Sequence, residues 1–312
     1  MTDPSEDERD TLPSVSVIVP TRQRPELLHR ALVSILGQDY EGAIEVLVVF
    51  DQEEPVDPGI DVGERRSIRV MRNERRPGLA GARNSGILAA SGDYVAYCDD
   101  DDEWLPAKIS RQIEASQRPP FAEVVVTGTT IVYEDRTTDR VLHADVDLRQ
   151  LLRSRTQEIH PSSILVSREA MVEGIGLVDE EMPGSYGEDY EWLLRAARRA
   201  PIRVVPISLV RVYWHRASFF ADRWSVIIDA IQYLLRKYPE FEREPKGLAR
   251  LYGRLAFANA AIGNRSEARV WARRTLRLDL RERRAYLALL VSVRLVSAES
   301  LMRLAHRTGR GI

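Results

Sequence analysis

Four consecutive aspartates, Asp99 to Asp102, directly follow an apolar run, Tyr94 to Cys98. Adjacent carboxylates repel one another and raise each other's pKa, so a fold gains no stability by gathering them at one point. A hard divalent cation such as Mn²⁺ or Mg²⁺ removes the repulsion because it prefers oxygen ligands. Mg²⁺ is commonly held by one or two carboxylates together with substrate phosphates. The run therefore predicts a metal and phosphate site, the alternative being a solvated acidic turn.

The segments around this run are typical of strands and helices in alternation. Val15 to Val19 and Ile44 to Phe50 are short, apolar and mostly β-branched, as buried strands are, and Ile68 to Met71 is a third candidate. Between the first two, Pro25 opens a helix with apolar residues at spacings of three and four. This alternation predicts an α/β fold with a mainly parallel sheet and helices on both faces.

Polar residues follow the ends of these strands. Thr21 to Arg24 follow the first strand, Asp51 follows the second, and Asp99 to Asp102 follow the strand at Tyr94 to Cys98. Ligands of open α/β sheets bind beyond the carboxyl ends of the strands. We therefore expect these three groups to share one site.

The rest of the chain divides into a mixed middle and a helical end. Strands are expected at Val124 to Thr127, Ile131 to Tyr133, Ile164 to Ser167, Val204 to Pro206 and Val210 to Trp214, with a helix at Asp189 to Ala200. Further helices are expected at Leu248 to Ile262, Ser266 to Arg277 and Arg283 to Val293. We predict a disordered segment over 1–13, an α/β domain over 14–220 and an all-helical extension over 221–312.

Composition and length fit this division. The chain has 312 residues, of which 44% are hydrophobic and 29% charged, which is ordinary for about two globular domains. The sequence contains no apolar run long enough for a spanning helix and no apolar stretch near Met1, so we expect neither a transmembrane helix nor a signal peptide. The single cysteine, Cys98, fits a reducing, cytoplasmic location.

Charge is distributed unevenly between the two parts. From residue 241 onward there are 16 basic and 6 acidic residues, a net charge near +10, and the preceding part carries about −12. The basic helices could contact anionic lipids at the inner face of the membrane, dock a partner, or form a solvated cap on the α/β domain. The basic residues are not interleaved with aromatic residues, so we expect no nucleic acid partner.

Four segments, in order, resemble glycosyltransferase family 2. Its members have the Rossmann-like GT-A fold, which binds nucleotide sugars. Val15 to Pro25 resemble the opening strand and loop of the family, Gly81 to Gly86 its Ala-Arg-Asn helix start, Tyr94 to Asp102 its DxD strand, and Gly187 to Leu193 its catalytic acid motif. With its continuation to His215, the resemblance covers about two thirds of the chain. It implies an inverting transfer of sugar from a nucleoside diphosphate to a hydroxyl acceptor.

The resemblance also implies roles for single residues. Asp189 matches the catalytic base, although an aspartate at a helix start can equally be a cap, and Glu188 is the nearest competitor. Asp101 matches the contact to Mn²⁺ or Mg²⁺, and His215 a late position near the metal or diphosphate. Residues that would bind the nucleotide sugar are Pro20, Thr21, Arg24, Asp51, Arg83, Asp99 and Asp100.

The donor base and the acceptor are less well defined by sequence. The family often has two aspartates after the second strand, whereas this chain has Phe50 and Asp51, so a UDP-sugar is favoured but the base stays open. Glu188, Trp192 and His160 are candidates for the acceptor side, although a tryptophan can equally pack in the core. A lipid-linked glycan is a candidate acceptor.

These patterns together predict a metal-dependent inverting glycosyltransferase of polysaccharide or glycoconjugate biosynthesis. Two other functions use similar features. A nucleotidyltransferase also places carboxylates and a metal at a parallel sheet, but no Gly-rich triphosphate loop follows the first strand. A non-catalytic nucleotide-sugar-binding module would have the same fold, but it would not need both Asp101 and Asp189.

Overall fold

A computed structural model of the 312-residue chain describes residues 12–214 and 223–307. His215 and most of the segment predicted to be disordered, residues 1–11, lie outside this part of the chain. The chain forms two compact units. The first comprises residues 1–148, 156–180 and 188–216, and the second residues 149–155, 181–187 and 217–312.

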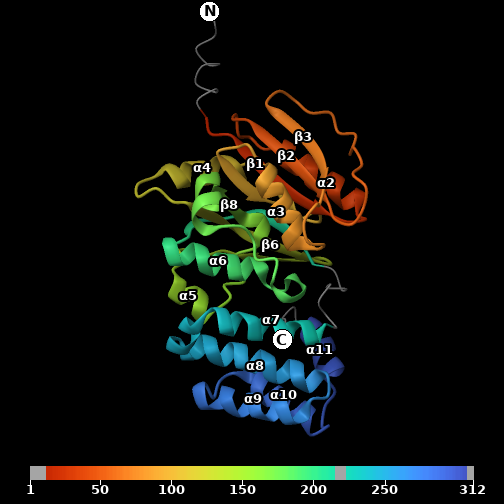
Figure 1. The fold of residues 1–312 in the computed structure, drawn as a ribbon, viewed down its shortest axis with the longest axis vertical. Coiled ribbons are helices and arrows are strands. Elements are labelled where there is room, and N and C mark those ends of the chain that lie inside the picture. The colour runs from red at the N-terminus through yellow and green to blue at the C-terminus, as the bar shows by residue number, and fades with distance from the viewer. Residues whose placement is uncertain (1–11, 215–222, 308–312) are drawn as a thin grey trace, which may run out of the picture. The chain divides into compact units, whose positions relative to one another are not determined.

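The first unit is built on one nine-stranded sheet, whose first strands are labelled in Figure 1. The strand order is β3-β2-β1-β4-β8-β6-β9-β5, and β7 pairs with β6. Strands β3, β2, β1 and β4 are parallel to one another, whereas β8 is antiparallel to both β4 and β6. The bounds are β1 Val15–Thr21, β2 Ile44–Phe50, β3 Arg66–Arg72, β4 Tyr94–Tyr97, β5 Glu103–Trp104, β6 Val124–Tyr133, β7 Arg136–Arg140, β8 Ile164–Ser167 and β9 Arg203–Tyr213.

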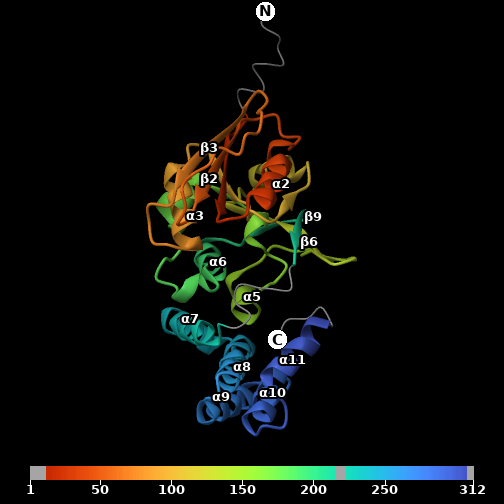
Figure 2. The same ribbon diagram turned by 90° about the vertical axis from the view of Figure 1, so that its right-hand side faces the viewer.

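Helices cover both faces of the parallel part, as Figure 2 shows for α2 (Pro25–Leu36) and α3 (Leu79–Ala89). Alternate side chains of β1 explain this, because successive residues of a strand point to opposite faces. Val17 packs in one core cluster with Leu32 of α2, whereas Ile18 faces α3. A Cβ on Gly86 of α3 would lie 2.5 Å from Ile18 Cγ2, so glycine allows this helix to approach the sheet.

The predicted α/β class is confirmed, with three differences in detail. The two segments predicted as strands between Val124 and Tyr133 form the single strand β6, because a bulge at Gly128 keeps its pairing with β9. Likewise, the two predicted between Val204 and Trp214 form the single strand β9. The later half of the sheet contains antiparallel pairs as well, so the sheet is mixed rather than mainly parallel.

The first unit contains further helices besides α2 and α3. They are the α-helices α4 Lys108–Gln117 and α6 Glu188–Arg199, a 3₁₀ turn at Pro161–Ser163 and a π-helix at Ala170–Ile175. The short helix α5, Leu148–Arg153, begins at the last residue of one segment of the first unit and continues into the second.

The second unit is helical, as the sequence predicts for its end. Its helices are α7 Trp224–Lys237, α8 Pro245–Ala261, α9 Arg265–Leu278, α10 Arg283–Ser292 and α11 Ala298–Arg307, with 3₁₀ turns at Pro183–Ser185 and Pro239–Arg243. Alanines of α8, α9 and α10 form its core around Phe257, which lets the three helices pack closely. Among the described residues, every helix is too short or too polar to cross a membrane.

Candidate active site

The four aspartates occupy the turn after β4, at the carboxyl end of the parallel strands, as predicted. The backbone of this turn is closed by a hydrogen bond from Asp102 N to Asp99 O, 3.1 Å long. The four side chains contact partners from three different segments of the chain. The turn therefore joins β1, α3 and the segment before β8 into one site.

Arg83 joins the acid turn to the start of α6. Its side chain is buried, and its Nη2 donates to Asp99 Oδ1 at 2.7 Å while Nη1 donates to Glu188 Oε1 at 2.6 Å. Burial by itself lowers the pKa of Arg83, but Asp99, Glu188 and Asp189 together raise it, so the guanidinium stays charged. A planar guanidinium suits this arrangement because its fixed donors can hold two carboxylates at once.

Thr21 and Arg24, which follow β1, hold the middle of the turn. Thr21 Oγ1 donates to Asp100 Oδ2 at 2.8 Å, and Arg24 Nη1 donates to Asp101 Oδ2 at 2.9 Å and to Asp100 Oδ1 at 3.3 Å. Burial raises the pKa of Asp100 to about 6, although the Thr21 hydrogen bond opposes it. Burial and the charge of Asp99 also raise the pKa of Asp101. Arg24 thus offsets only part of the acidic charge.

The last aspartate meets the segment before β8. Ser162 Oγ donates to Asp102 Oδ2 at 2.5 Å and accepts from Asp99 N at 3.0 Å, while His160 Nδ1 lies 3.3 Å from Asp102 Oδ2. Burial, followed by the field of Asp99, raises the pKa of Asp102 well above its usual range. Burial lowers the pKa of His160, although Asp99 and Asp189 oppose it.

Asp99, Asp102 and His160 form a group that fits a divalent cation. Each offers one ligand atom, and these atoms lie within 4.8 Å of one another. The two carboxylates suit Mn²⁺ or Mg²⁺, whereas the imidazole nitrogen suits a transition-metal ion rather than Mg²⁺. The three residues therefore differ from the predicted ligands, since Asp101 contacts Arg24 and His215 lies outside the described residues. The role of both as ligands stays a prediction.

Asp51 lies buried after β2 and accepts hydrogen bonds from the loop that leads to α3. Asn73 Nδ2 donates to its Oδ1 at 2.8 Å, Gln52 Nε2 to its Oδ2 at 2.8 Å, and Gly78 N reaches both oxygens at 3.1 Å. Burial alone would raise the pKa of Asp51, but these hydrogen bonds lower it overall. The carboxylate therefore orders the loop between β3 and α3.

The start of α6 places the two acids of the predicted catalytic motif differently. Glu188 is buried against Arg83, which commits its carboxylate to that ion pair. Asp189, next along, is half-buried, and its charge acts on both Arg83 and His160. Trp192 is buried, and its indole donates to Gly176 O at 3.0 Å, so it packs in the core.

The structure thus brings Thr21, Arg24, Arg83 and the acid turn together with Glu188, Asp189 and His160. Pro20, within β1, is buried one residue before Thr21. Sequence reasoning missed Ser162 and Asn73 as positioning residues. The only sequence signal for Ser162 was its place beside His160 in a loop-like segment, and Asn73 had none, because both act through contacts with residues far along the chain.

Comparison with known proteins identifies the family. Residues 16–172, half of the chain, match the family model described as glycosyl transferase family 2. The chain belongs to this family. A pre-mycofactocin glycosyltransferase of Mycobacterium tuberculosis (strain H37Rv) is 30% identical over 207 residues, which are 63% of this chain and 42% of that protein. The chain thus spans less than half the length of this relative.

Solved structures agree in fold. S. aureus TarS in complex with UDP-GlcNAc has a TM-score of 0.63 at 16% identity, with 95% of this chain and 92% of that chain covered. The mannosyltransferase PcManGT of Pyrobaculum calidifontis, in complex with GDP-Man and Mn²⁺, has a TM-score of 0.52 at 17% identity, with 96% and 82% covered. At these identities the likeness is one of fold.

Proposed function

We propose that this family 2 member is a metal-dependent inverting glycosyltransferase that moves a sugar from a nucleoside diphosphate to a hydroxyl acceptor. The observation that carries the proposal is the pair of contacts made by Arg83. This one buried arginine joins the acid turn after β4 to the acidic start of α6 through contacts of 2.7 and 2.6 Å. Metal-binding and proton-accepting carboxylates thereby belong to a single site.

The donor diphosphate needs positive charge in an acidic site. Asp99, Asp102 and His160 would hold the cation, which as a Lewis acid neutralises charge on the leaving diphosphate. Thr21 and Arg24 fix Asp100 and Asp101 beside it and keep the turn in one conformation. The base of the nucleotide would lie near Asp51, and the complexes of the structural neighbours with UDP-GlcNAc and GDP-Man support a UDP- or GDP-sugar.

Asp189 is the best candidate for the base that removes the acceptor proton. Glu188 is bound to Arg83, whereas Asp189 is half-buried at the first turn of α6. A general base must lie within hydrogen-bond reach of the hydroxyl, and a carboxylate at a helix start is held in a defined position. Arg83 holds the start of α6 against the acid turn through its contacts with Glu188 and Asp99. Inversion follows when the hydroxyl attacks the face opposite the diphosphate.

The basic helices favour an acceptor at a membrane surface, such as a lipid-linked glycan. Leu280 and Leu295 are 70% and 72% exposed, and arginines Arg281 and Arg294 adjoin them. Exposed leucines next to arginines suit the boundary of an anionic bilayer. We expect the protein to sediment with vesicles that contain phosphatidylglycerol, and equal sedimentation with neutral vesicles would contradict this contact.

The test of the proposed function is release of nucleoside diphosphate from UDP- and GDP-sugars with Mn²⁺. Asp189→Asn should lower turnover by about 10²-fold or more while donor binding stays within twofold. Asp229→Asn, at an exposed position of α7, is the matched control and should leave both unchanged. Release of pyrophosphate from a nucleoside triphosphate instead would indicate a nucleotidyltransferase. Donor binding without turnover in the wild type would indicate a binding module.

A further inference from the structure

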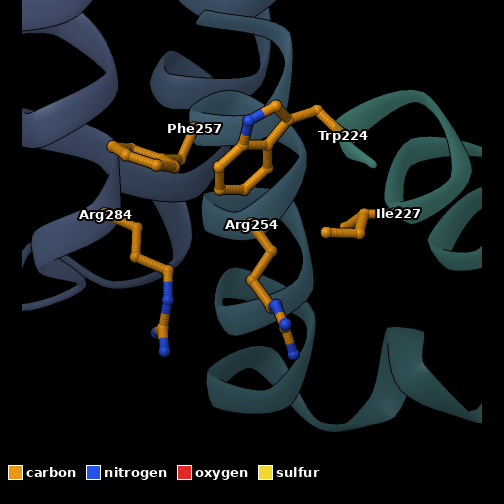
Figure 3. A pocket seen from close by; sticks show the side chains of 5 residues that line it. All are labelled: Trp224, Ile227, Arg254, Phe257 and Arg284. Atoms are coloured by element: carbon orange, nitrogen blue, oxygen red, sulfur yellow. The ribbon is translucent and has the colours of Figure 1, made fainter. Parts of the chain in front are cut away.

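The helical unit contains a pocket lined by both aromatic and basic side chains. Trp224 and Ile227 of α7, Arg254 and Phe257 of α8, and Arg284 of α10 line a small cavity of about 20 Å³ that is partly open to solvent. Figure 3 shows the Trp224 and Phe257 rings together, with the two arginine side chains extending to the same side below them. The ring centroids are 5.6 Å apart in an edge-to-face arrangement.

Helix packing explains why these arginines converge. Arg250 and Arg254 are four residues apart on α8 and therefore share one face of the helix. Between them, Gly253 lies against the start of α10, where an added Cβ would be 2.9 Å from Glu282 Cγ and 3.3 Å from Arg284 Cβ. The missing side chain lets α10 approach α8 and brings Arg284 beside Arg254.

Arg254 lies in the electrostatic field of three other arginines. Burial lowers the pKa of Arg254 to about 10; Tyr186 opposes this, and Arg155, Arg284 and Arg250 lower the pKa further. At this pKa the group is still charged at neutral pH. Its Nη2 donates to the Tyr186 hydroxyl, which is a neutral partner.

The guanidinium of Arg284 has a partner at Nη1 but none at Nε among the described residues. Its Nη1 donates to Glu282 Oε1 at 3.0 Å, which offsets one positive charge. Its Nε is buried and has no hydrogen-bond partner among the described residues. A buried donor without a partner is costly, and so is the gathering of like charges. A bound anion would relieve both.

We propose that this pocket binds the phosphoryl group of an organic phosphate. Guanidinium groups bind phosphate oxygens in a bidentate manner, which matches two arginines that extend to one side of an opening. The partly exposed Trp224, backed by the buried Phe257 and Ile227, provides an apolar contact for the carbon part of the ligand. The ligand is either a soluble phosphate ester or a phospholipid headgroup. The site lies within the helical unit and does not depend on the proposed transferase activity.

The test uses the full chain and isothermal titration with sn-glycerol 3-phosphate and with inorganic phosphate. Arg284→Gln and Arg254→Gln should each weaken binding about tenfold or more, because each removes a charge-assisted contact. Arg273→Gln, at an exposed position of α9, is the matched control and should bind as the wild type does. Binding should also weaken as the salt concentration rises.

Vesicles distinguish the two sources of the phosphoryl group. The vesicles contain phosphatidylcholine and phosphatidic acid. If they bind the wild type but not Arg284→Gln, and the soluble phosphates do not bind, the ligand is a lipid headgroup. Binding of soluble phosphates alone indicates a phosphate ester. The proposal is wrong if neither binds, or if both arginine variants bind as tightly as the wild type. A cooperative urea unfolding transition of Arg284→Gln, like that of the wild type, shows that this variant is folded.

Discussion

Lys108 is a buried lysine whose charge should make the stability of the protein depend on pH. Its side chain is fully buried, its Nζ donates to Gln112 Oε1 at 2.7 Å, and Nζ lies 3.8 Å from the centroid of the Trp104 ring. Burial lowers its pKa from 10.5 to about 7, although Cys98 opposes this. The same Gln112 donates to Ser163 O at 2.9 Å, so Lys108 supports the segment that meets the acid turn.

The sign and size of the effect follow from this pKa. Below pH 7 both the folded and the unfolded chain carry the proton, and the cost of burying the charge is present in full. Between pH 7 and 10.5 the unfolded chain binds more protons, so the free energy of unfolding rises with pH. Each pH unit contributes about 1.4 kcal/mol, which amounts to about 5 kcal/mol over the whole interval.

Lys108→Met removes this dependence while it keeps the length of the side chain. At pH 7 the gain of about 5 kcal/mol from removing the charge is reduced by about 1–3 kcal/mol, since Gln112 loses a hydrogen-bond partner. The variant should therefore be more stable than the wild type at pH 7. Its advantage should shrink by about 1.4 kcal/mol for each pH unit as the pH rises.

The assay is urea unfolding of the wild type and the variant at several pH values between 7 and 9. Lys246→Met is the matched control because Lys246 is exposed at the start of α8. The difference between this control and the wild type should be the same at every pH. If the difference in unfolding free energy between Lys108→Met and the wild type is also the same at every pH, the reasoning is refuted. Lys108 would then titrate alike in the folded and unfolded chains.

Three further substitutions test the site and its support. Arg83→Lys should lower the free energy of unfolding by about 1–3 kcal/mol and the rate of diphosphate release by about 10²-fold, because an ammonium lacks the planar fork that holds Asp99 and Glu188 together. Urea unfolding measures the first effect and the release assay the second. A fully active variant would contradict this role of Arg83. Gly86→Ala should lower the free energy of unfolding, measured with urea, by about 1–3 kcal/mol because the added Cβ clashes with Ile18. Gly63→Ala is the control: its added Cβ meets no atom within 4 Å, so stability should change by less than about 0.5 kcal/mol. Asp51→Asn should lower the free energy of unfolding by about 1 kcal/mol at pH 7 and by progressively less as the pH falls below 3.8. The reason is that the hydrogen bonds that lower the pKa of Asp51 stabilise the fold only while the carboxylate is ionised. An equal loss at pH 7 and pH 3 in urea unfolding would contradict this.

Elements that bury apolar residues in a regular pattern could be predicted from the sequence. The strands β1, β2 and β4 and the helices α2, α8, α9 and α10 lie within a few residues of their predicted positions. Strand β7 was not predictable, because its residues, Arg136–Arg140, are polar and nearly all exposed. Gly128 interrupts the apolar pattern of β6, so the sequence indicated two strands where a bulge joins them.

The site was predictable where one segment carries its own chemistry. The acid turn and Arg83 fall into this group, since both lie directly after a strand or within a short motif. Ser162 and Asn73 act through side-chain contacts with residues 60 and 22 positions away, and no local pattern indicates which loop will reach them. The meeting of His160 with Asp99 and Asp102 depends on the same tertiary packing.

Thermal unfolding with UDP, GDP, CDP and dTDP, each with and without Mn²⁺, tests the central claim most directly. A ligand at about 100 times its dissociation constant adds about 2.7 kcal/mol of stability, which raises the unfolding temperature by several degrees for a domain of about 200 residues. We predict such a shift for one diphosphate, only when Mn²⁺ is present, and its loss in Asp99→Asn. A shift with nucleoside triphosphates alone, or no shift with any diphosphate, would contradict a metal-dependent nucleotide-sugar transferase.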